Sequence, residues 1–160
     1  MKKNDIRLYN VLFPIWFLFL FPQLWLIMLP VNFLVDSLVV FLSALRQKLE
    51  HPFTLWRKSI LPVWIIGFVS DLIGAGLTVL LSYGFGMLSR LGIETPNLIL
   101  FPGTTLISIP GLILAGILIY LLNLKFSFKE SGLEPQQILK LCLHLALWTA
   151  PYTMLIPIYG

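Results

Sequence analysis

The chain has 160 residues, of which 58% are hydrophobic and only 11% are charged, and its mean hydropathy is +0.92. A soluble globular domain carries about 25% charged residues, so this composition excludes an ordinary soluble protein. The eleven basic and seven acidic residues give a net charge of +4 and gather in short clusters between long apolar segments. This pattern predicts an all-α, polytopic membrane protein in which residues 1–160 form a single integral membrane domain.

The cysteine count and the absence of known motifs narrow the function. The single cysteine, Cys142, excludes an intrachain disulfide and a multi-cysteine metal centre. The sequence contains neither of the phosphate-binding signatures GxxxxGK[ST] and GxGxxG. It also lacks HExxH, the signature of zinc-dependent hydrolases, and GxSxG, the signature of hydrolases with a serine nucleophile. We therefore expect a protein that is not an enzyme and holds no metal or cofactor. Basic residues beside apolar segments are typical of topology determinants, so nucleic acid is not an expected partner.

The apolar segments predict about five transmembrane helices. The first apolar tract, 8–45, would be about 57 Å long as one helix, nearly twice a hydrocarbon core of about 30 Å. Pro30 is the expected break, because proline removes a backbone donor and disfavours the helical conformation at the preceding residue. The predicted spans are 11–29, 31–45, 60–88, 98–122 and 141–158. The second is short, which leaves a re-entrant or interfacial helix open.

The distribution of basic residues favours five spans with the N-terminus inside and the C-terminus outside. In that arrangement ten basic residues lie on the cytoplasmic side and only Arg90 lies outside, which is a strong positive-inside bias. If 8–45 crossed only once, Lys2, Lys3 and Arg7 would move outside and the ratio would fall to seven against four. Short loops and this simple charge pattern favour a bacterial cytoplasmic membrane.

Small residues form stripes at helical spacing on the third and fourth predicted spans. Helices in lipid associate through close packing of small residues and through hydrogen bonds, since apolar contact between helices gains little over contact with lipid. We therefore expect these two spans, which a short loop joins, to form a tight antiparallel pair. The predicted packing face consists of Gly67, Ser70, Gly74 and Thr78 on the third span and Ser108, Gly111 and Ala115 on the fourth.

Asp71 is the strongest candidate for a functional residue. It lies about 16 Å into the third predicted span, near the middle of the hydrocarbon core. An ionised carboxylate there costs several kcal/mol unless it is paired, hydrated or protonated, and intramembrane acids often mark proton or ion paths. The alternative is structural: Asp71 would be neutral, or would bond to a neighbouring serine or threonine and fasten the helices together.

Asp36 and Asn32 share a narrow polar stripe of the second predicted span with Ser43 and Gln47. If the second and third spans pack together, Asp36 and Asp71 would line one cavity, with Asn32 as a further oxygen donor. Such a pair of carboxylates can bind a cation or share a proton. In the last span we expect His144 to extend toward the cytoplasmic interface.

Three functions remain open at this point. The first is a non-enzymatic subunit or accessory component of a membrane assembly, which agrees with the lack of a soluble domain and of catalytic motifs. The second is a small oligomeric channel or ion- or proton-coupled transporter that uses Asp71 with Asp36. The third is an intramembrane enzyme that acts on lipid or peptide. The expected partners are the lipid bilayer and either further copies of the chain or a larger membrane complex.

Overall fold

The computed structural model describes residues 22–93, 99–101, 104–129 and 131–155. Most of this part belongs to four α-helices: α2 (Pro22–Arg46), α3 (Pro52–Arg90), α4 (Ile109–Leu122) and α5 (Pro135–Trp148). Four helical segments of the described chain, 27–46, 52–90, 106–127 and 135–155, are long and apolar enough to cross a membrane. The protein is therefore an all-α helical membrane protein, as its composition predicts.

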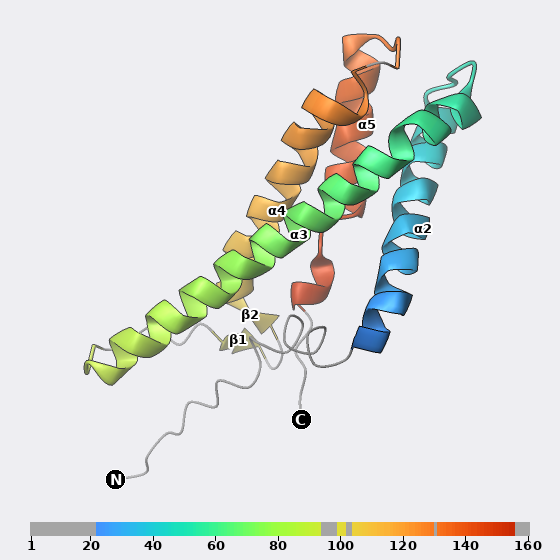
Figure 1. The fold of residues 1–160 in the computed structure, drawn as a ribbon. Coiled ribbons are helices and arrows are strands. Elements are labelled where there is room, and N and C mark those ends of the chain that lie inside the picture. The colour runs from blue at the N-terminus through green and yellow to red at the C-terminus, as the bar shows by residue number, and fades with distance from the viewer. Residues whose placement is uncertain (1–21, 94–98, 102–103, 130, 156–160) are drawn as a thin grey trace.

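The helices run alternately in opposite directions and form a closed ring of neighbours (Figure 1). Contacts join α2 to α3, α3 to α4, α4 to α5, and α5 back to α2. The α2–α3 and α4–α5 connections lie at the same end of the bundle, while α3 runs diagonally across it. We call the end that holds these two connections the basic end, because it carries Arg46, Lys48, Arg57, Lys58, Lys125, Lys129 and Lys140.

The predicted break at Pro30 is wrong. Helix α2 continues through Pro30 as one helix of 25 residues, so 31–45 is the C-terminal part of a longer helix and not a short separate one. Lipid offers no water to backbone groups, so an interrupted helix costs more there than a single missing hydrogen bond. Most of the predicted first span, 11–29, lies outside the described residues. The number of crossings and the orientation stay predictions.

The other helices also begin or end away from their predicted positions. Helix α3 starts eight residues before the predicted 60, because Pro52 occupies its first turn and Leu55 and Ser59 are buried on its inner side. The predicted span 98–122 is an α-helix only from Ile109. Before it, strands β1 (Ile99–Phe101) and β2 (Thr104–Thr105) pair in an antiparallel hairpin, followed by the 3-10 helix η2 (Leu106–Ser108).

Helix α5 lies earlier in the chain than the predicted span 141–158. It begins at Pro135 because Glu134 and Gln137 form a capping box, in which the Glu134 backbone N–H donates to Gln137 Oε1 at 3.1 Å. It ends at Trp148, and Pro151, which lacks a backbone donor, follows shortly after. The 3-10 helix η4 (Tyr152–Leu155) continues the chain beyond this break.

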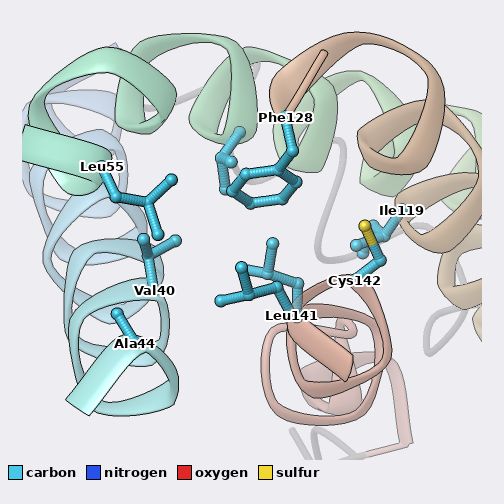
Figure 2. Close-up of a cluster of buried hydrophobic side chains, with 9 residues drawn as sticks. Val40, Ala44, Leu55, Ile119, Phe128, Leu141 and Cys142 are labelled. Carbon is cyan, nitrogen blue, oxygen red and sulfur yellow. The ribbon is translucent and has the colours of Figure 1, made fainter. Parts of the chain in front are cut away.

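Apolar side chains from all four helices meet in a core toward the basic end (Figure 2). Phe128 is its largest member and follows the π-helix η3 (Asn123–Ser127), which extends α4. Asn123 Nδ2 donates to the Ile119 carbonyl oxygen, one turn earlier in α4, at 2.8 Å. The core consists of Val40, Ala44, Leu55, Val63, Ile119, Phe128, Leu141, Cys142 and Leu145.

Helices α3 and α4 approach each other most closely at Gly74 and Gly111. A Cβ atom added to Gly74 would lie 2.5 Å from the Gly111 carbonyl oxygen, so only glycine allows this approach. All seven residues of the predicted packing face are buried. They do not all serve the same pair, however, because Gly67 lies against Asp36 of α2.

Replacing Gly74 with alanine tests this contact. We expect Gly74→Ala to lower the free energy of unfolding by about 1–3 kcal/mol, because the added methyl group would overpack two backbones. Gly76→Ala is the matched control, since a Cβ atom at Gly76 meets nothing within 4 Å. Both changes give α3 the same gain in helix propensity. Unfolding of the two variants in bicelles measures the difference, and equal stabilities would show that the helices do not depend on this contact.

Candidate intramembrane acidic site

The polar stripe of α2 faces the interior of the bundle. Asp36, at its centre, is only 4% exposed, and Ser43, two turns further along, is also 4% exposed. Aspartate is almost never this buried in proteins unless it has a partner. The stripe therefore brings a carboxyl group into the space between α2, α3 and α5.

Asp36, Asp71 and Asn32 line one small cavity. Its volume is about 30 Å³, and Gly67, Phe68, Val35 and Thr149 complete the lining. A cavity needs roughly 10–15 Å³ to hold a water molecule, so this one has room for a water-sized ligand and excludes an organic substrate. The structure thus brings together the three residues of the predicted polar site. Their role in ion or proton binding stays a prediction.

Gly67 of α3 lies next to the Asp36 carboxyl group of α2. It is one helical turn before Asp71, and a Cβ atom added to it would be 3.4 Å from Asp36 Oδ2, an ordinary contact distance. The Asp36 carboxyl group therefore lies beside the same part of α3 that carries Asp71. Asp36 and Asp71 are near enough for their charges to repel each other.

The two carboxyl groups differ in their hydrogen bonding. Asp36 is a hydrogen-bond partner of the Thr149 side chain, and the single hydroxyl proton of Thr149 is donated to the Leu145 carbonyl oxygen at 2.8 Å. Asp71 Oδ1 is buried and has no hydrogen-bond partner among the described residues. The neighbouring Ser70 does not provide one, because its hydroxyl group donates to the Ile66 carbonyl oxygen at 2.7 Å. Among the described residues, Asp71 Oδ1 thus has no serine or threonine partner that would fasten the helices together through this atom.

The end of α5 lies at the same cavity. Thr149 is the C-terminal cap of α5 and one of the lining residues. The C-terminus of a helix carries a partial negative charge from its free carbonyl groups. Two carboxyl groups and a helix C-terminus therefore direct negative potential into one cavity, which suits a small cation or a proton. The described residues contain no cluster of three or more histidine, cysteine or acidic side chains that could hold a metal ion.

A second polar contact joins α2 and α5 closer to the basic end. Ser43 Oγ lies 2.5 Å from His144 Nδ1, so the imidazole ring bonds to the neighbouring helix; its predicted extension toward the interface stays a prediction. Sequence reasoning missed both His144 and Thr149 as partners of the α2 stripe. No spacing in the sequence pairs these residues, because His144 and Thr149 lie five positions apart whereas Asp36 and Ser43 lie seven apart.

Comparison with known protein families, with curated proteins and with solved structures found no match. The helices and the composition define an integral membrane protein. Its function is therefore inferred from the geometry of the acidic site and of the surfaces around it.

A double-mutant cycle between Ser43 and His144 measures the contact between α2 and α5. We expect Ser43→Ala and His144→Leu to show a coupling free energy of about 0.5–1.5 kcal/mol, the range found for hydrogen bonds between membrane helices. Ser59→Ala combined with His144→Leu is the control, because Ser59 bonds within its own helix to the Leu55 carbonyl oxygen. Additive effects in both cycles would contradict the hydrogen bond.

Proposed function

We propose that this chain is a non-enzymatic membrane protein that binds a proton or an alkali cation between Asp36 and Asp71, as part of an ion-coupled transporter or channel. The observation that carries the proposal is the unpartnered Asp71 Oδ1, which is buried beside a second carboxyl group and a water-sized cavity. A buried carboxylate without compensation is strongly destabilising. A bound cation or proton supplies that compensation.

The depth of the site supports ion binding within the membrane. Asp71 is the central residue of α3, with nineteen residues on each side of it in Pro52–Arg90. Asp36 lies close to the middle of α2 (Pro22–Arg46). Acidic residues at this depth are rare in membrane proteins and usually serve ion or proton movement. The same depth places the site about equally far from both ends of the bundle.

The interruption of α5 also supports a cation. Membrane transporters often bind their coupling ions at discontinuous helices, where free carbonyl groups and half-helix C-termini coordinate Na⁺ or H⁺. Here α5 ends at Trp148 and η4 resumes at Tyr152, with Thr149 at the cavity. The chain combines this interruption with two carboxyl groups, an amide from Asn32 and a hydroxyl group. All of these ligands are oxygen atoms, which hard cations prefer.

The small size of the site indicates that one chain does not act alone. A cavity of about 30 Å³ accepts an ion but does not form a pathway across the bilayer. We propose that further copies of the chain or a larger membrane complex complete the pathway. With the basic end on the cytoplasmic side, the charge distribution fits a bacterial cytoplasmic membrane.

Flux measurements in sealed liposomes test the proposal. We expect Asp71→Asn and Asp36→Asn each to lower proton or Na⁺ flux by about tenfold or more, because an amide neither binds a proton nor balances a cation. Ser70→Ala is the control, since Ser70 is adjacent and buried but bonds only to its own helix. All variants are compared at equal helix content by circular dichroism.

The possible results separate two roles for the site. Flux that survives both asparagine variants would overturn the proposed role of the carboxyl groups. Absence of flux from the well-folded native protein, together with Na⁺-dependent thermal stabilisation that Asp71→Asn abolishes, would assign the site to a subunit that binds the ion and needs a partner to move it.

A further inference from the structure

A larger cavity lies at the basic end, between the last turn of α2 and the first turns of α5. Its volume is about 510 Å³, within the usual range for small-molecule sites. Arg46 lies ten residues beyond Asp36 on α2, about 15 Å along the helix, so this cavity is separate from the acidic site. Its lining consists of Arg46, Gln47, Glu134, Gln136, Gln137, Lys140 and His144.

The lining suits an anion. Arg46 and Lys140 contribute two positive charges, and the lining includes one carboxylate, Glu134. That carboxylate already accepts the backbone N–H of Gln137 in the capping box of α5. Its charge therefore offsets the positive end of the α5 dipole. Arg46 of α2 and Lys140 of α5 therefore remain available to bind an anion.

Gln47 independently indicates that the cavity suits a polar ligand. Its Nε2 and Oε1 atoms are both buried, and neither has a hydrogen-bond partner within the described chain. A buried amide with no partner is costly and rare in native proteins. Because Gln47 lines the cavity, a bound group with both acceptor and donor atoms, such as a hydrated phosphate, would satisfy it.

The position of the cavity points to a lipid as the source of that phosphate. It lies at the ends of membrane-spanning helices, where lipid headgroups are located, and on the side that carries most basic residues. About one helical turn toward the membrane centre, α2 exposes Leu42 and α5 exposes Leu143. These side chains offer an apolar surface to acyl chains directly beyond the headgroup.

We propose that the cavity between α2 and α5 binds the phosphate group of an anionic phospholipid. Arg46 and Lys140 balance its charge from two helices, and Gln47 bonds to its oxygen atoms or to a water molecule that it holds. The bound lipid would join the two helices that also carry the Ser43–His144 contact. This site is independent of the ion chemistry proposed for Asp36 and Asp71.

Native mass spectrometry of the delipidated full-length protein, titrated with dioleoyl phosphatidylglycerol in detergent, tests the site. We expect Arg46→Gln with Lys140→Gln to weaken lipid binding by about tenfold or more, given the usual contribution of each basic residue at a membrane surface. The matched control is Lys125→Gln with Lys129→Gln. It removes the same charge at the same end from two exposed residues that do not line the cavity.

A neutral substitution and a competitor sharpen the test. Gln47→Leu leaves the charge unchanged and is expected to weaken binding several-fold, although the native helix content is retained. Inorganic phosphate at the lipid concentration is expected not to displace the lipid, because it lacks acyl chains. Equal weakening in both double variants, or no effect of Gln47→Leu, would overturn the proposal. Displacement by inorganic phosphate would overturn the lipid as the source.

Discussion

The close approach of α3 to α4 at Gly74 and Gly111 is the contact on which the remaining packing depends. Helices in lipid gain little from apolar contact alone, so backbone proximity has to provide the attraction. This pair fixes one side of the ring, and the core around Phe128 fills the space that α2 and α5 then enclose. The polar stripe of α2 cannot face lipid, because its polar groups would have no hydrogen-bond partners there, so it faces α5. The acidic cavity follows from these two constraints.

Sequence reasoning predicted the class of the protein and the partners within the acidic site better than it predicted the helix boundaries. Asp36 and Asp71 stand out because acids are rare in apolar segments, and helical spacing placed Asn32 with Asp36. The error at Pro30 arose because proline was treated as a helix breaker. In lipid the other backbone groups have no water to bond to, so the helix continues and keeps its remaining hydrogen bonds. The end of α5 was missed because Leu, Ile and Met continue beyond Trp148, so hydropathy carries no sign of the interruption.

Long-range pairings were beyond the reach of the sequence alone. Nothing in the spacing of Ser43 or Thr149 shows that they meet α5 and α2 across the bundle, because helix rotation about its axis is set by packing against neighbours. For the same reason, the sequence did not show that the small residues of α3 pack against two different helices. Gly67 and Gly74 lie on one stripe of small residues, yet they lie against different helices since α3 crosses the bundle at an angle.

The length of α3 couples the protein to the thickness of its membrane. Its 39 residues extend about 58 Å, whereas a hydrocarbon core measures about 30 Å. Such a helix is accommodated by a tilt, by local thickening of the bilayer and by extension of its ends, which carry Arg57, Lys58 and Arg90, into the headgroup regions. Longer or shorter acyl chains would change that tilt and rotate α3 relative to α2. Since Asp71 lies at the centre of α3, close to the point of crossing, hydrophobic mismatch would act directly on the separation of the two carboxyl groups.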